Sequence, residues 1–190
     1  MNVAESARHD GIEVKEDLYR KKRISAWIVW TVALSAIFLD QASKILVETT
    51  MKLGQSDAVV GDLFRLTYIK NAGGAFGIFL GGGWFYFLAS LIAVMMILFY
   101  LRRLPAGRIL PRLSLAMILG GALGNLIDRL RSGVVTDFLD FGIGTTRWPV
   151  FNLADAFITV GVMLFFIAML RTQKEGAEDR TQADCSPAGS

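Results

Sequence analysis

Four apolar stretches, each long enough to cross a lipid bilayer as a helix, carry most of the hydrophobicity of this chain. They cover about residues 24–47, 84–101, 113–130 and 150–170. A helix that spans the hydrocarbon core needs about 17–25 predominantly apolar residues. We therefore expect a mainly α-helical integral membrane protein with four transmembrane helices.

Basic residues outside these stretches indicate which segments face the cytoplasm. They gather before the first stretch, between the second and third, and after the fourth, and cytoplasmic loops carry such an excess of Lys and Arg. Both termini are therefore expected in the cytoplasm, with residues 48–83 and 131–149 on the outer side. The basic residues concerned are Arg20, Lys21, Lys22, Arg23, Arg102, Arg103, Arg108, Arg112, Arg171 and Lys174.

The length of 190 residues leaves room for one compact domain with polar ends. Residues 24–170 form the expected membrane domain. Residues 1–23 and 171–190 mix acidic and basic groups with few apolar ones, so we expect disordered or loosely helical cytoplasmic extensions. The first apolar stretch is too long for a signal peptide and lacks a small-residue cleavage site, so we expect it to be retained.

The scarcity of cysteine and histidine excludes several kinds of site. Cys185 and His9 are the single residues of their types, and both lie in the polar ends. The chain therefore forms no internal disulfide, no Ser-His-Asp triad and no metal site built on His or Cys. We predict no metal and no cofactor, with a divalent cation held by carboxylates alone as a weaker alternative. The net charge of +3 is explained by the inward-facing loops and calls for no nucleic acid.

Two outer segments alternate apolar and polar residues as strands do. Residues 64–70 and 133–142 are expected to be strands at the membrane surface. In the second of them Asp137 shares a face with Val135, Leu139 and Phe141, and apolar surroundings disfavour an ionised carboxylate. Asp140 lies on the opposite face and is expected to be solvated. The glycine-rich residues 71–77 are expected to form a turn.

Polar and ionisable residues intrude on the spans, and the predicted topology brings all of them to the outer side. Charged groups within or beside a span are costly and mark functional sites by default. The structural alternative is that they anchor the helices at the interface or form packing ion pairs. These residues are Asp40, Gln41 and Lys44 in the first span, Asn125, Asp128 and Arg129 in the third, and Asn152 and Asp155 in the fourth.

Two of the outer carboxylates lack a cation nearby in the sequence. Asp40 has Lys44 one helical turn later, and Asp128 adjoins Arg129, so each is expected to form a structural ion pair. Asp137 and Asp155 have no such partner. Asp155 lies near a helix N-terminus, where the dipole favours an anion, and Asn152 is a plausible cap. Two carboxyls in such different surroundings are able to share a proton, as in an aspartic protease.

Three glycines of the third span, Gly120, Gly121 and Gly124, permit another helix to approach closely. That helix is either a neighbouring span of the same chain or a bound substrate. The sequence leaves both interpretations open.

Five short motifs occur in order over about residues 25–170. They are Asp40-Gln41-Ala42-Ser43-Lys44, Asn71-Ala72-Gly73-Gly74-Ala75-Phe76, Gly124-Asn125-Leu126-Ile127-Asp128-Arg129, Val134-Val135-Thr136-Asp137-Phe138 and Phe151-Asn152-Leu153-Ala154-Asp155. Together they closely resemble the motifs of the lipoprotein signal peptidase (signal peptidase II) family. The long N-terminal extension departs from the shorter family members, and the role of residues 1–23 stays open.

The resemblance implies an aspartic endopeptidase of the bacterial inner membrane with its site toward the outer leaflet. Its substrate would be a diacylglyceryl-modified prolipoprotein, cut just before the lipid-modified cysteine. The family fold adds a small extracytoplasmic sheet that cradles the substrate and a mobile segment above it. Membrane lipids and globomycin-type peptide inhibitors are the other implied partners, and a monomer is expected.

The resemblance also assigns roles residue by residue. The catalytic pair falls on Asp137 and Asp155, the same two carboxylates that the search for local cations singled out. The residues that match positions lining or supporting the site are Asp40, Lys44, Asn71, Gly121, Asn125, Asp128, Arg129, Asn152 and Ala154.

Two other classes of protein would also place polar residues inside a small helical bundle. A polytopic transporter or proton channel would line a path through both leaflets, whereas the inner halves of these spans are almost purely apolar. A non-enzymatic membrane scaffold would tolerate Asp137→Asn and Asp155→Asn.

Overall fold

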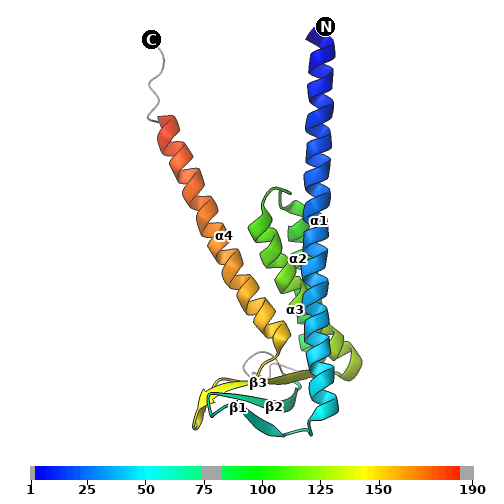
Figure 1. Cartoon of the computed structure of the whole chain (residues 1–190), viewed down its shortest axis with the longest axis vertical. Coiled ribbons are helices and arrows are strands. Elements are labelled where there is room, and N and C mark those ends of the chain that lie inside the picture. The colour runs from blue at the N-terminus through cyan, green and yellow to red at the C-terminus, as the bar shows by residue number, and fades with distance from the viewer. Residues whose placement is uncertain (1–2, 74–82, 185–190) are drawn as a thin grey trace.

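The computed structural model describes residues 3–73 and 83–184, in which four long helices stand on a small four-stranded sheet (Figure 1). The predicted class, a mainly helical membrane protein with a small sheet, is confirmed. The elements are α1 (Val3–Thr50), β1 (Ser56–Val60), β2 (Phe64–Asn71), α2 (Gly83–Arg103), α3 (Ile109–Ser132), β3 (Val135–Ile143), β4 (Thr146–Arg147) and α4 (Leu153–Asp184).

Each helix contains a segment that is long and apolar enough to cross a membrane. These segments are Ala26–Thr50, Trp84–Arg103, Ile109–Ser132 and Leu153–Arg171. Two of the four starting positions differ from the sequence prediction by three or four residues. The third span starts earlier because Pro111 is tolerated in the first turn of a helix. The fourth starts later because Phe151 pairs with Leu139 of β3 before the helix begins.

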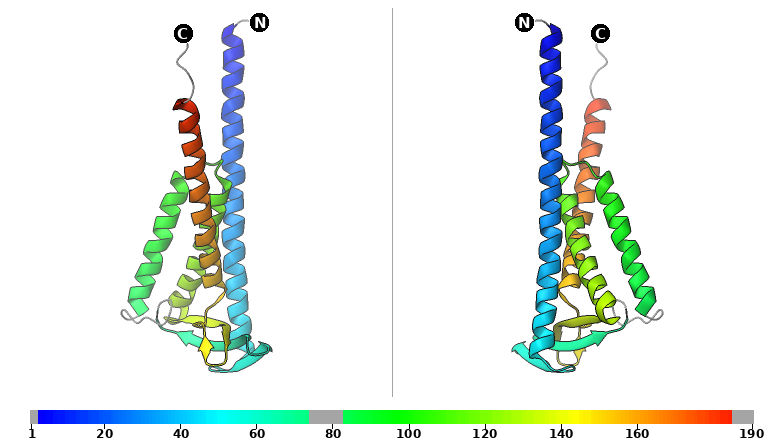
Figure 2. Two further views of the ribbon diagram at one scale, coloured as in Figure 1. Left: turned by 90° about the vertical axis from the view of Figure 1, so that its left-hand side faces the viewer. Right: turned by 90° about the vertical axis from the view of Figure 1, so that its right-hand side faces the viewer.

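The polar ends of the chain extend the first and last helices, α1 and α4. Helix α1 already begins at Val3 and α4 extends to Asp184, so a helical state is described for most of both extensions. These two helical ends leave the bundle on the same side, opposite the sheet (Figure 2). The cytoplasmic placement of both termini stays a prediction.

The sheet is antiparallel with the strand order β1-β2-β3-β4, and it lies across one end of the helices (Figure 2). Its two longest strands, β2 and β3, correspond to the strands expected at residues 64–70 and 133–142. Val47 at the end of α1 packs with Tyr68 of β2 and Phe138 of β3, which seats the sheet on the helix. The expected glycine turn begins after Asn71, and its residues 74–77 lie outside the described part of the chain.

Helix α3 occupies the centre of the bundle and packs against the other three helices. Its glycines permit this packing. A Cβ atom added at Gly120 would lie 2.6 Å from Cβ of Ala36 on α1, and one at Gly121 would overlap the backbone oxygen of Ala154 on α4. The close approach is therefore between spans of the same chain, and this favours the intramolecular interpretation of the glycines.

Candidate active site

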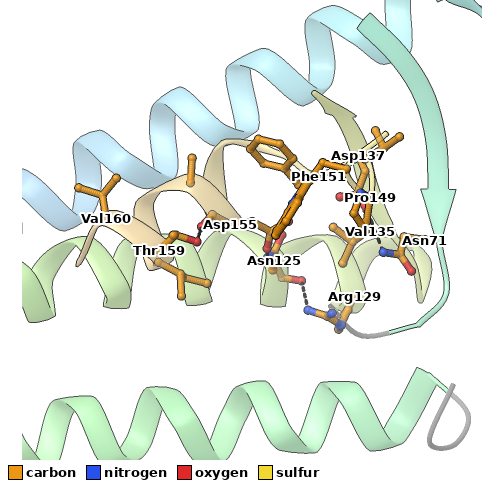
Figure 3. A pocket seen from close by; sticks show the side chains of 14 residues that line it. Asn71, Asn125, Arg129, Val135, Asp137, Pro149, Phe151, Asp155, Thr159 and Val160 are labelled. Atoms are coloured by element: carbon orange, nitrogen blue, oxygen red, sulfur yellow. Dashed lines mark hydrogen bonds between the residues drawn. The ribbon is translucent and has the colours of Figure 1, made fainter. Parts of the chain in front are cut away.

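A cavity of about 530 Å³ lies between α3, the start of α4 and the sheet (Figure 3). Most of its lining is apolar, including Val135, Phe151 and Val160. The polar side chains on the lining are Asn71, Asn125, Arg129, Asp137, Asp155 and Thr159. The two carboxylates that the sequence singled out therefore share one cavity, although they lie on a strand and on a helix.

Asp137 reaches the cavity from near the start of β3. Its side chain is 1% exposed, and strand alternation turns it toward the same side as Val135. Nδ2 of Asn71 donates a hydrogen bond to Oδ2 of Asp137 at 2.8 Å. Burial raises the pKa of Asp137 to about 6, and the negative charge of Asp155 adds to this, while the amide of Asn71 opposes it.

Asp155 reaches the cavity from the first turn of α4. Oδ1 of Asn152 accepts a hydrogen bond from the backbone N–H of Asp155 at 3.0 Å, which is the predicted cap. In return, the backbone N–H of Asn152 donates to Oδ2 of Asp155 at 3.4 Å, so the two residues form a reciprocal capping box. Nδ2 of Asn125 donates to Oδ1 of Asp155 at 2.8 Å. The carboxyl therefore lies at the positive end of the α4 dipole.

The amide of Asn152 connects the surroundings of both carboxyls. Its Nδ2 donates to Oδ1 of Asp137 at 2.6 Å and lies 3.2 Å from Oδ1 of Asn125. Asn152 itself is fully buried. Each carboxyl of the pair is thus held by neutral amides, which orient it without neutralising it as a cation would.

Behind the cavity, Lys44 forms a buried ionic cluster with two carboxylates. Its Nζ atom lies 2.8 Å from Oδ2 of Asp40 and 2.8 Å from Oδ2 of Asp128, and it donates to Oδ1 of Asn125 at 3.0 Å. Lys44 is 2% exposed and Asp40 is 0% exposed. Because Asn125 contacts both Lys44 and Asp155, the cluster is joined directly to the cavity.

Asp40 also fixes the start of α4. Its Oδ1 accepts a hydrogen bond from the backbone N–H of Ala154 at 2.9 Å. The small residue Gly124 lies against the Asp40 carboxyl, which leaves no room for a side chain there. Gln41 completes the arrangement by donating to Oδ1 of Asp128 at 2.9 Å. The first span, the third span and the start of α4 therefore meet at one set of buried hydrogen bonds.

The prediction of an ion pair between Asp128 and Arg129 is wrong. Asp128 pairs with Lys44 instead, because adjacent residues of a helix point in different directions and do not face each other. The guanidinium of Arg129 points toward α2, where it lies 3.3 Å from Oγ of Ser90, and it also lines the cavity. Arg129 is therefore available to a bound molecule, whereas Asp128 belongs to the buried cluster.

The expectation that Asp140 is solvated is also wrong. Asp140 is 5% exposed, accepts a hydrogen bond from Oγ1 of Thr67 at 2.6 Å and forms an ion pair with Arg147 at 2.7 Å. Burial alone would raise its pKa, but these two contacts outweigh burial and lower it. The residue lies outside the cavity and links β2, β3 and β4.

Three polar residues near the site were missed by the sequence reasoning. Glu48 lies in the last turn of α1, Lys70 precedes Asn71 on β2, and Thr136 precedes Asp137 on β3. Their side chains contact one another. Strand alternation was the signal that could have found two of them, because it places Lys70 and Thr136 on the face of the sheet opposite Asn71 and Asp137. In the described residues, the structure has no cluster of three or more His, Cys, Asp or Glu side chains suited to a metal ion.

Comparison with known proteins gives a consistent result. Residues 32–171 match a family model described as "Signal peptidase (SPase) II". The chain is 47% identical over 140 residues to a lipoprotein signal peptidase of Desulforapulum autotrophicum, covering 70% of this chain and 86% of that one. It is 41% identical over 149 residues to a lipoprotein signal peptidase of Halothermothrix orenii, covering 78% and 99%. A solved structure of a bacterial membrane enzyme matches with a TM-score of 0.71 and 32% identity, over 77% of this chain and 90% of that one.

Proposed function

Because this chain belongs to the signal peptidase II family, we propose that it is a membrane-embedded aspartic endopeptidase that removes the signal peptides of prolipoproteins. The observation that carries the aspartic mechanism is that Asp137 and Asp155 line one cavity, each held by neutral amides. The protein is a multi-pass membrane peptidase, and Asp137 and Asp155 are its proposed catalytic residues.

The opposed surroundings of the two carboxyls support different protonation states. Asp137 has its pKa raised to about 6 by burial and is the carboxyl that more readily holds the proton. Asp155 lies at the N-terminus of α4 and accepts a hydrogen bond from Nδ2 of Asn125. We therefore propose Asp137 as the initial acid and Asp155 as the initial base.

The proposed reaction is hydrolysis without a covalent intermediate. Water attacks the scissile carbonyl carbon and gives a proton to Asp155, while Asp137 transfers its proton to the carbonyl oxygen. In the second step Asp155 returns a proton to the leaving amine, the C–N bond breaks, and Asp137 recovers a proton from the tetrahedral hydroxyl. The pair thus ends in its starting protonation state.

Further stabilisation must come from polar groups aimed at the developing oxyanion, because general acid-base catalysis supplies only about 10²–10⁴-fold. The strongest candidate is Arg129, which lines the cavity and whose guanidinium contacts only hydroxyl and carbonyl oxygens in the hydrogen bonds of the described residues. The amides of Asn71 and Asn152 already bind Asp137. Their main proposed role is therefore to orient that carboxyl.

The position of the cavity supports a substrate that leaves the bilayer beside it. The cavity lies at the sheet end of the spans, opposite the basic ends of α1 and α4. With the basic ends in the cytoplasm of a bacterial inner membrane, the cavity faces the outer leaflet. A signal helix lying among the spans would then present its scissile bond at the depth of Asp137 and Asp155, and its lipidated cysteine would follow directly.

We propose that the enzyme acts as a monomer. The same cavity is the proposed binding site of globomycin-type peptide inhibitors. A transporter finds less support, because the buried polar cluster around Lys44 lies at one end of the bundle and forms no path across it in the described residues.

The substrate class is tested with purified protein in detergent and a synthetic prolipoprotein segment, with and without a diacylglyceryl group on its cysteine. We expect cleavage directly before the lipidated cysteine and little cleavage of the unlipidated segment. Asp57→Asn removes an exposed carboxylate of β1, outside the cavity, and is the matched control that should cleave normally. Equal cleavage of both segments would contradict the proposed lipid requirement, and cleavage of neither would contradict the function.

A further inference from the structure

We propose that Glu48, Lys70 and Thr136 form a positioning latch that holds the strand pair carrying Asn71 and Asp137 against the end of α1. The latch contacts neither the substrate nor the attacking water, and acts only through the placement of Asp137. The inference rests on the proposed catalytic role of Asp137.

The three latch residues contact one another mutually. Nζ of Lys70 lies 2.6 Å from Oε1 of Glu48 and donates to Oγ1 of Thr136 at 2.8 Å, while Oγ1 of Thr136 donates to Oε1 of Glu48 at 2.6 Å. The side chains of Glu48 and Lys70 are 23% and 28% exposed, so solvent screens the pair only in part. Hydrogen bonds in which one or both partners are charged are short and hold a defined geometry.

The register of the sheet explains how the latch acts on the cavity. Lys70 lies opposite Thr136 in the pairing of β2 with β3. Successive side chains of a strand point to opposite faces. Asn71 and Asp137, the next residues along each strand, therefore lie on the other face, where they line the cavity and bind each other. The latch thus holds the back of the same strand segment that presents Asp137 at its front.

The latch adds directional contacts between the sheet and α1. The sheet is seated on α1 by apolar contacts among Val47, Tyr68 and Phe138, which are not directional. A hydrogen bond of 3.3 Å from the backbone N–H of Thr136 to Oδ2 of Asp128 ties β3 to α3. The apolar contacts and this bond preserve the fold when the latch is broken, as do the backbone hydrogen bonds between Tyr68 and the segment after α1. Within the described part of the chain, the latch alone joins β2 and β3 to α1 itself through side-chain hydrogen bonds. A misplacement of reacting groups by about 1 Å is able to lower a rate about 10²-fold.

The test measures steady-state cleavage of the diacylglyceryl segment by Thr136→Val, Lys70→Met and Glu48→Gln. Each variant should lower kcat by about tenfold or more while KM changes less than about twofold. Arg65→Met is the matched control, because Arg65 is a basic residue of β2 whose ion pair, with Asp62, lies away from the cavity. It should retain the kcat of the unaltered protein.

Two further readouts separate positioning from a general loss of structure. The amide of Asn71 stabilises the ionised form of Asp137. Loosening that contact therefore raises the pKa of Asp137 and moves the high-pH limb of the kcat profile upward. The double variant Glu48→Lys with Lys70→Glu, the reversed pair, restores the ion pair with its charges exchanged. Its kcat should exceed that of Glu48→Lys alone and of Lys70→Glu alone. Thermal unfolding in detergent should change little in Thr136→Val, which keeps the side-chain volume.

Unchanged kcat and pH profiles in all three single variants would overturn the latch. So would a loss of activity that only follows the loss of folded protein, or a reversed pair no better than the single variants. These outcomes are distinct from failure of the proposed function, because a latch that fails leaves cleavage dependent on Asp137 and Asp155. If those two carboxylates prove dispensable, the proposed function fails first.

Discussion

Nδ2 of Asn152 donates a hydrogen bond to Oδ1 of Asp137 at 2.6 Å, so the residue that caps α4 also holds the carboxyl group of β3. This single side chain couples the start of a membrane helix to the centre of the sheet. Because Asp155 lies in the turn that Asn152 caps, the same contact sets the relative positions of the two carboxyls that we propose as the catalytic pair.

Replacing Asn152 separates its two roles. Serine also caps helices, but its side chain is too short to reach Asp137. Asn152→Ser should therefore keep the cap and lower kcat, whereas Asn152→Ala should be less stable than Asn152→Ser by about 0.5–2 kcal/mol of cap energy. Denaturant unfolding and cleavage rates measure both effects. Equal kcat in Asn152→Ser and the parent would show that the contact with Asp137 is unimportant for cleavage.

The hydrogen bond from Asn71 predicts a change in pH dependence. This bond favours ionised Asp137 and opposes the effect of burial, which raises the pKa to about 6. Asn71→Ala should raise that pKa further, so a larger fraction of Asp137 keeps its proton at a given pH. Since Asp137 is the proposed acid, the high-pH limb of kcat should move to higher pH. A limb that stays in place, or moves to lower pH, would contradict the assignment.

The buried cluster around Lys44 predicts a large loss of stability. Lys44→Met leaves Asp40 and Asp128 buried without their shared cation, and breaking a buried ion pair from one side costs about 3–5 kcal/mol. Unfolding in detergent measures the loss, with Lys52→Met at an exposed position as the control. A loss below about 1 kcal/mol would mean that the cluster contributes little to the stability of the fold.

The crossing of α3 and α4 predicts a strict size limit at Gly121. A methyl group there would overlap the backbone oxygen of Ala154, next to Asp155. Gly121→Ala should displace the start of α4, with an overpacking cost of about 1–3 kcal/mol and a lower cleavage rate. Gly107→Ala, where a Cβ atom meets nothing within 4 Å, is the comparison and should behave as the parent. Full activity of Gly121→Ala would contradict a rigid crossing.

Much of this architecture is predictable because hydrophobic length and alternation are local properties of a sequence. The four spans follow from continuous apolar runs, and β2 and β3 follow from period-two alternation. The cap formed by Asn152 follows from its place before an apolar helix. The grouping of Asp137 and Asp155 in one cavity follows from topology, since both were expected at the outer ends of the bundle.

The misassigned contacts all depend on tertiary packing. Asp128 binds Lys44 because α1 crosses α3 at that point, and nothing local to Asp128 signals this. Asp140 is buried because β4 brings Arg147 beside it. The contact of Glu48 with Lys70 joins residues 22 positions apart and depends on the seating of the sheet on α1. Sequence periodicity gives the face of each residue, but it does not give the neighbour that the face meets.

The most direct test of the proposed mechanism is cleavage of a diacylglyceryl prolipoprotein segment by purified Asp155→Asn and Asp137→Asn proteins. Asparagine keeps the size of each side chain but cannot accept or deliver the proton, so each variant should cleave at least about 10²-fold more slowly than the parent. An unfolding transition in detergent should show that each variant is folded. Cleavage by folded Asp155→Asn at a rate close to that of the parent would contradict the aspartic pair.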